Sequence, residues 1–183
     1  MKTGFILITC ALSLVTLQSA VAQDVLVDND FDDGTSQDWT LANSASIYSG
    51  TTYSYNSTPH ALALSTGTGG TATLTDPLAL ISSGYTNVTW RFYVNSPTGG
   101  YGEKYYFEYS NNGGSNWIQL AGGSLQYLAT GFKEYSISTA NLSDNFLFRI
   151  RMNDSSPKSI YADSMLITAT PEVPPAGTLI TIK

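Results

Sequence analysis

The sequence contains one cysteine, Cys10, and one histidine, His60, in 183 residues. Cys10 lies in an apolar N-terminal segment that we expect to be removed, so the mature chain has no thiol. This excludes cysteine nucleophiles, cysteine-ligated zinc and a disulfide scaffold. A chain of this size buries enough apolar surface to fold without disulfides. A serine triad would depend on His60, and no G-x-S-x-G motif is present, so we do not expect an enzyme.

Charged side chains are also scarce, at 12% of residues. The 14 acidic residues outnumber the 8 lysines and arginines, and the formal net charge is −6. This balance argues against nucleic acid and anionic membranes as partners. Ser, Thr, Gly, Asn and Tyr are abundant instead, a composition common in secreted β-proteins.

The two ends of the sequence differ from the rest. Lys2 precedes an apolar run from Phe5 to Leu17, and the small residues Ala20 and Ala22 follow it, so residues 1–22 are predicted to be a secretory signal peptide. The run is shorter than the ~20 residues that span a membrane, so no transmembrane segment is expected in the mature chain. We expect a secreted, extracellular protein with one domain over 23–169 and a Pro-containing tail over 170–183.

No segment has helical periodicity, and short alternating runs recur with turn residues between them. In the clearest run, Val88, Trp90, Phe92 and Val94 alternate with polar residues, as in a half-buried strand. The other predicted strands are Asp24–Phe31, Trp39–Leu41, Ala61–Ser65, Thr71–Thr75, Phe132–Ser138, Phe146–Met152 and Ile160–Thr168, while Ser44–Pro59 is a loop or a strand plus a loop. Together they predict an all-β, antiparallel sandwich of two sheets.

A hairpin is predicted from Tyr105 to Leu120. Asn111–Gly114 supplies residues that tolerate the positive φ of a tight turn. The spacing Ser110-x-Asn112-x-Gly114-x-x-Trp117 resembles an Asp-box with Asn where Asp is usual. Because Asp-boxes stabilise a turn and lie away from the chemistry of the enzymes that contain them, this motif predicts a hairpin and not a hydrolase.

Several pieces in this order resemble extracellular jelly-roll modules of the MAM-domain and reelin-repeat type. They are Phe31-Asp32 with Trp39, Ala61–Leu64, Ala72–Leu78, Val88–Phe92, Tyr109–Trp117, Phe148–Arg151 and Tyr161–Ile167. The resemblance implies a jelly roll, concanavalin-like or galactose-binding-like, without catalytic activity, that serves adhesion, receptor contact or glycan binding. The sequence departs from the family pattern at Ser164, where the family often has an acidic residue. It also lacks the family's cysteines and the lysines used for receptor contact.

The resemblance also implies a structural calcium between the first and last strands. Asp30 and Asp32 with Asp163 are the predicted ligands, because calcium takes six to eight oxygen ligands in flexible loops. The neighbouring acids Asp28 and Asp33 would add negative charge there. A solvated acidic turn is the alternative.

Two groups of side chains are candidates for ligand binding. The first is an outer sugar-binding face, where aromatic rings stack on sugars and guanidinium groups donate to hydroxyls or carboxylates; its members are Arg91, Tyr93, Tyr106, Arg149 and Arg151. Its alternative is a solvated face with Arg–Glu pairs to Glu103, Glu108 or Glu134. The second is the loop from Tyr48 to His60 with Tyr53 and Tyr55, since tyrosines offer contact area at low entropy cost. Its alternative is a loop packed on its own sandwich.

The sequence therefore predicts a non-catalytic binding module for an extracellular glycan or surface protein. Two alternatives stay open. One is a structural component of an extracellular matrix, and the other is a jelly-roll glycan hydrolase that would use Glu103 or Glu108.

Overall fold

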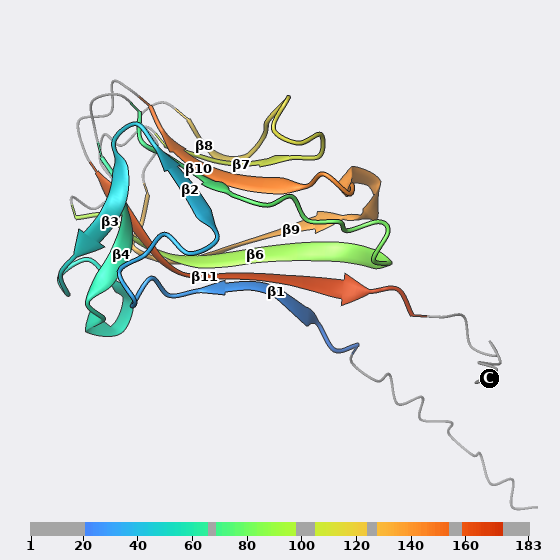
Figure 1. Ribbon diagram of the computed structural model, residues 1–183, viewed down its shortest axis with the longest axis horizontal. Helices are drawn as coiled ribbons and strands as arrows, with labels where there is room; N and C mark the ends of the chain where they lie inside the picture. The colour runs from blue at the N-terminus through green and yellow to red at the C-terminus, as the bar shows by residue number, and fades with distance from the viewer. Residues whose placement is uncertain (1–20, 66–68, 98–104, 124–127, 154–158, 174–183) are drawn as a thin grey trace, which may run out of the picture.

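The computed structural model describes residues 21–65, 69–97, 105–123, 128–153 and 159–173. The chain forms two antiparallel β-sheets packed face to face (Figure 1), so the predicted all-β jelly-roll sandwich is confirmed. Within these residues the helical structure consists of two short 3₁₀ turns, η1 (Tyr55–Ser57) and η2 (Thr139–Asn141), and no helix is long and apolar enough to cross a membrane. Most of the predicted signal peptide and residues 174–183 of the predicted tail lie outside the described residues.

The first sheet, sheet A, has the strand order β3-β4-β11-β6-β9, and β1 also pairs with β11. Its strands are β1 (Asp24–Asn29), β3 (Ala45–Ser49), β4 (His60–Leu64), β6 (Tyr85–Asn95), β9 (Gly131–Ser138) and β11 (Ile160–Pro171). β4 pairs with the first part of β11 and β1 with its second part, so β11 holds three strands together.

The second sheet, sheet B, has the order β2-β5-β10-β7-β8. Its strands are β2 (Trp39–Ala42), β5 (Thr71–Leu74), β7 (Tyr105–Ser110), β8 (Ile118–Gly123) and β10 (Leu147–Met152). β7 and β8 form the predicted hairpin.

The core fills the space between the sheets. Val88, Trp90, Phe92 and Val94 are all fully buried, as their alternation in the sequence predicts, and so are Phe146, Phe148, Ile150 and Met152. Aromatic rings join the two sheets directly: the ring centroids of Trp90 and Phe148 are 4.7 Å apart, and those of Phe92 and Phe107 are 4.8 Å apart. Apolar and polar residues therefore alternate along these strands because one face of each strand is buried in the core.

Several strand boundaries differ from the sequence prediction. β1 ends at Asn29 rather than at Phe31, and β6 begins at Tyr85 rather than at Val88. The last strand continues past Thr168, because Thr170 and Pro171 still pair with β6. The segment Ser44–Pro59, predicted as a loop or a strand plus a loop, contains β3 and the turn η1. In η1, Asn56 adopts a positive φ of 50°, a conformation that asparagine tolerates better than most residues.

Candidate functional site

An acidic junction lies on the outer side of sheet A, where β11 has a bulge. The register of β11 against β6 shifts between Asp163 and Leu166, and Ser164 has a φ of 48°. Asp163 is only 1% exposed because the segment around η1 covers it. Its Oδ2 accepts a hydrogen bond from the main-chain N–H of Tyr55 at 2.7 Å, and its Oδ1 accepts one from the N–H of Ser164 at 2.6 Å.

This position disfavours the charged form of the Asp163 carboxyl group. Burial raises its pKa from 3.8 to about 6, the hydrogen bonds from Tyr55 and Ser164 oppose the rise, and the nearby charge of Asp32 adds to it. The Oδ1 atom of Asp32 is itself buried and has no hydrogen-bond partner. One carboxylate oxygen without a donor, in Asp32, thus lies close enough to the buried carboxylate of Asp163 for its charge to be felt there, an arrangement that a cation would relieve.

Asp30, the third predicted metal ligand, takes part in the turn after β1. Its Oδ1 accepts hydrogen bonds from the N–H of Asp32 and from the side chain of Gln37, which shapes the turn after β1. Within the described residues, no group of three or more acidic or histidine side chains is arranged to hold a metal ion. If calcium binds here, Asp32 and Asp163 would offer it two carboxylates, and main-chain carbonyls or water would have to supply its remaining oxygen ligands.

The outer face of sheet A carries six aromatic rings, which we call the aromatic strip: Tyr48, Tyr53, Tyr55, Tyr93, Phe132 and Tyr161. Tyr53 stacks on Tyr161 with ring centroids 4.4 Å apart, and Tyr48 contacts both rings. All three are half-buried. The loop before β4 thus packs on its own sandwich, as the alternative to a recognition loop predicts, while leaving part of each ring open to solvent.

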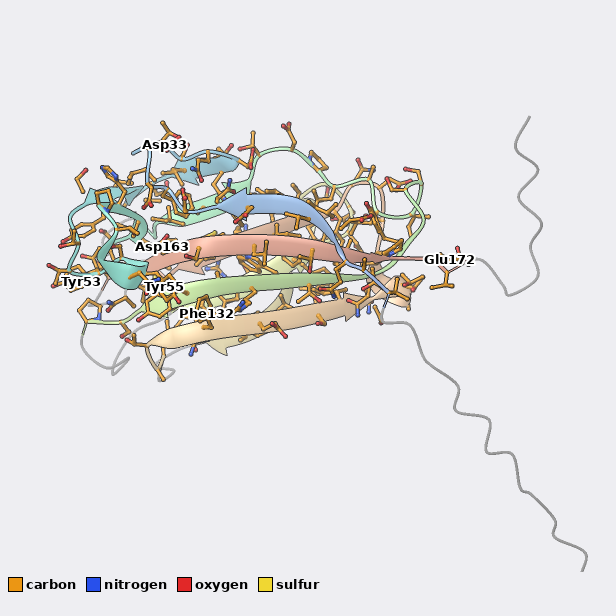
Figure 2. The ribbon with its side chains drawn as sticks, turned by 90° about the horizontal axis from the view of Figure 1, so that it is seen from below. Asp33, Tyr53, Tyr55, Phe132, Asp163 and Glu172 are labelled. Atoms are coloured by element: carbon orange, nitrogen blue, oxygen red, sulfur yellow. The ribbon has the colours of Figure 1, made fainter. Side chains whose placement is uncertain are left out.

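The other half of the aromatic strip lies over β6 and β9. Tyr55 contacts Tyr93 and Phe132 at centroid distances of 4.9 Å and 5.0 Å. Phe132 is 39% exposed, and the guanidinium carbon of Arg91 lies 4.1 Å from its ring centroid. Figure 2 shows Tyr53, Tyr55 and Phe132 near one end of sheet A, with Asp163 beside Tyr55. The acidic junction therefore supports the turn that carries the middle of the strip.

The outer face of sheet B carries a second group, which we call the arginine ladder: Trp117, Arg149, Glu108, Arg151 and Tyr106. Glu108 is 6% exposed and accepts from both arginines, with Arg149 Nη2 at 2.6 Å from Oε2 and Arg151 Nη2 at 3.3 Å from Oε1. Arg149 lies over the ring of Trp117 and Arg151 over the ring of Tyr106. The predicted pairing of outer arginines with Glu108 is present in this ladder.

The turn between β7 and β8 positions Trp117. The Ser110 hydroxyl accepts from the N–H groups of Asn112 and Gly114, and the Asn112 side chain accepts from the N–H of Asn116. The side chains that suggested an Asp-box thus hold the turn together, while membership of that motif class stays a prediction. This turn therefore places the indole ring of Trp117 at the end of the arginine ladder, against Arg149.

The structure therefore divides the predicted ligand residues between opposite faces. Arg91 and Tyr93 lie on β6 of sheet A, and Tyr53 and Tyr55 lie on the segment that packs over that sheet. Tyr106, Arg149 and Arg151 belong to sheet B. Sequence reasoning did not select Phe132 or Tyr161 for the first group or Trp117 for the second. The sequence did contain a signal for Phe132. An aromatic residue at an outward position of a strand leaves an apolar ring in solvent unless another side chain on that face covers it.

No protein-family model matches the sequence, and no curated protein is significantly similar to it. Solved structures do share its fold. The CBM22-1 xylan-binding domain from Paenibacillus barcinonensis has a TM-score of 0.57 and 16% identity, over 85% of this chain and all of that one.

Two further structures have the same fold. The K3 cleaved adhesin domain of Lys-gingipain from Porphyromonas gingivalis has a TM-score of 0.56 and 15% identity, over 79% of this chain and 99% of that one. The TmCBM61 structure in complex with β-1,4-galactotriose has a TM-score of 0.50 and 10% identity, over 76% of this chain and 93% of that one. At these identities the likeness establishes a β-sandwich of the kind found in carbohydrate-binding modules and adhesin domains.

Proposed function

We propose that this chain is a secreted, non-catalytic carbohydrate-binding module that holds a neutral polysaccharide on the aromatic strip. The observation that carries the proposal is the group formed by Tyr53, Tyr55 and Phe132 on the outer face of sheet A, with half-buried or exposed rings. Aromatic rings stack on the apolar C–H faces of sugar rings, which suits them to an uncharged polymer. Arg91, exposed above Phe132, would donate hydrogen bonds to hydroxyl groups.

The fold supports this reading, since solved carbohydrate-binding modules and an adhesin domain share it. The state of Glu108 argues against the hydrolase alternative. Two guanidinium groups engage the two carboxylate oxygens of Glu108, so this side chain is committed to ion pairs rather than placed to donate a proton to a glycosidic oxygen. Glu103 lies outside the described residues.

We further propose that Asp32 and Asp163 hold a structural calcium. The orphaned Oδ1 of Asp32 and the buried carboxylate of Asp163 supply two negatively charged ligands from opposite ends of the chain. The ion would neutralise their mutual repulsion and fix the turn after β1 against the bulge of β11. Asp163 would at the same time keep its hydrogen bond to Tyr55.

Retention on insoluble and soluble neutral polysaccharides, measured by pull-down and affinity electrophoresis in calcium and in EDTA, tests the binding proposal. We expect Tyr55→Ala and Phe132→Ala each to weaken retention about 3- to 10-fold, the size of one aromatic contact. Tyr106→Ala, on the opposite face, is the matched control and should retain full binding. Circular dichroism spectra must show that all three variants fold.

Normal retention of folded Tyr55→Ala and Phe132→Ala would rule out the aromatic strip as the site. If the wild-type chain binds no neutral polysaccharide in either buffer, carbohydrate binding by this strip is wrong. A surface protein would then become the leading partner, as the adhesin-like fold allows.

A further inference from the structure

The arginine ladder carries an unbalanced charge. Glu108 contributes one negative charge and pairs with two positive charges, those of Arg149 at 2.6 Å and Arg151 at 3.3 Å. These are the ion pairs that the three side chains form among the described residues, so no second acid in that part of the chain pairs with the extra guanidinium. The surface of an acidic chain, with a formal net charge of −6, thus contains a local cationic site.

The extra charge is partly removed from water. The side chains of Glu108, Arg149 and Arg151 are 7%, 18% and 32% exposed, so Arg151 is the open end of the cluster. Burial lowers the pKa of Arg149, Glu108 raises it, and the neighbouring charge of Arg151 lowers it again. An anion that approaches Arg151 would balance the charge at a site where solvent screens it poorly.

The two guanidinium groups are held in place before any ligand arrives. The guanidinium carbon of Arg149 lies 3.9 Å from the ring centroid of Trp117, and that of Arg151 lies 4.0 Å from the ring centroid of Tyr106. Glu108 fixes the other side of both groups. Such preorganisation reduces the entropy that an incoming ligand must overcome, and a planar guanidinium group matches a carboxylate with two parallel hydrogen bonds.

The surface beside the ladder identifies the kind of anion. Along β5, Thr71 lies opposite Arg151 and Thr73 opposite Arg149, so uncharged hydroxyl groups border the guanidinium groups. The ladder thus offers a cation, hydroxyl groups and aromatic rings in one row. A uronic acid residue presents the complementary set: a carboxylate, ring hydroxyls and an apolar ring face.

We propose that the arginine ladder is a second binding site, on the face opposite the aromatic strip, for a polysaccharide that contains uronic acids. The two sites differ in chemistry, since one takes a neutral polymer and the other an anionic one. The proposal goes beyond the function assigned to the aromatic strip and does not depend on it.

Isothermal titration of the full chain with a short oligogalacturonate, and with the same oligomer methyl-esterified, tests the proposal. We expect the acid form to bind at least about 10-fold more tightly, because a hydrogen bond to a charged group contributes about 1.5–3 kcal/mol, or roughly 10- to 100-fold. Arg151→Gln should lower the affinity for the acid form by about 10-fold or more. It should leave the melting temperature nearly unchanged, since it leaves a balanced Glu108–Arg149 pair.

Lys133→Gln makes the same change of charge on β9 of sheet A, and it should leave the affinity for the oligogalacturonate unchanged. Arg151→Lys keeps the charge but loses the forked donor geometry, so an intermediate affinity is expected. This variant also tests the site if Arg151→Gln does not fold.

Equal affinity for the acid and the ester, or equal losses for Lys133→Gln and Arg151→Gln, would overturn the proposal. So would an absence of binding to the acid form, or equally tight binding of a short polyglutamate peptide. Phe132→Ala distinguishes the two sites, because it should weaken binding of neutral polysaccharide only. Loss of either activity alone therefore leaves the other proposal intact.

Discussion

The main-chain N–H of Tyr55 donates a 2.7 Å hydrogen bond to Oδ2 of Asp163, although the two residues are 108 positions apart in the sequence. The Thr58 hydroxyl lies 3.5 Å from the same oxygen. One carboxylate on the last strand thus anchors the turn that carries Tyr55, the middle of the aromatic strip. Three predictions concern this junction and the buried polar contacts near it.

Calcium should stabilise the wild-type chain, and Asp163→Asn should remove that effect. At a calcium concentration 100 times the dissociation constant, binding to the folded state alone adds about 2.7 kcal/mol, or roughly 5–10 °C in melting temperature for a chain of this size. Differential scanning fluorimetry in calcium and in EDTA measures this shift. Asp28→Asn removes the same charge from an exposed position on β1 and should keep the calcium effect. Identical melting temperatures of the wild type in the two buffers would contradict the calcium proposal.

Without calcium, the stability of the folded chain should fall as the pH rises from about 4 to about 6. The unfolded Asp163 carboxyl group ionises near 3.8, whereas burial holds its folded pKa at about 6. Between these values the folded chain keeps a proton that the unfolded chain has released, so raising the pH favours unfolding. The loss is complete above pH 6 and amounts to at most about 3 kcal/mol.

Urea unfolding in EDTA at pH 4 and pH 7 measures this loss, and other titrating groups cancel in the comparison with Asp163→Asn. The wild type should lose more stability than the variant over this range. A variant with the same pH dependence as the wild type would show that Asp163 titrates normally.

Asn29→Ala should destabilise the chain by about 1–3 kcal/mol, the cost of leaving a buried donor without its acceptor. Asn29 Oδ1 accepts a 2.9 Å hydrogen bond from the indole N–H of Trp39, which is 1% exposed. Asn87→Ala is the matched control, because Asn87 Oδ1 is buried without any partner and its removal loses no hydrogen bond. Chemical unfolding should give a clearly larger loss for Asn29→Ala, and equal losses would contradict the role assigned to Asn29.

The strands of the core could be predicted from the sequence because each has one buried face. Trp90 and Phe148 lie on strands with strict alternation, and both are fully buried. β3 was harder to assign, since its neighbours in the chain are polar and Ser46 is exposed on an edge strand. The secretory signal, the MAM-like resemblance and the calcium ion stay predictions.

The candidate sites were only partly predictable, because alternation shows which residues point outward but not which sheet they belong to. Arg91 and Arg149 have similar sequence surroundings, yet β6 lies in sheet A and β10 in sheet B. Asp32 and Asp163 could be brought together only through the resemblance to known modules. The contact of Tyr55 with Asp163 joins a turn to a bulge, and no local pattern indicates it.

The pairing of β1 with β11 has a practical consequence. Asp24 lies opposite Ala169, so the two ends of the described domain leave the sandwich side by side (Figure 1), while Tyr53 lies at the other end of the sheet from Glu172 (Figure 2). A short peptide linker would therefore suffice to join the ends, and new termini could be opened elsewhere by circular permutation. A tag at either end would orient immobilised copies alike, with the Tyr53 end directed away from the support.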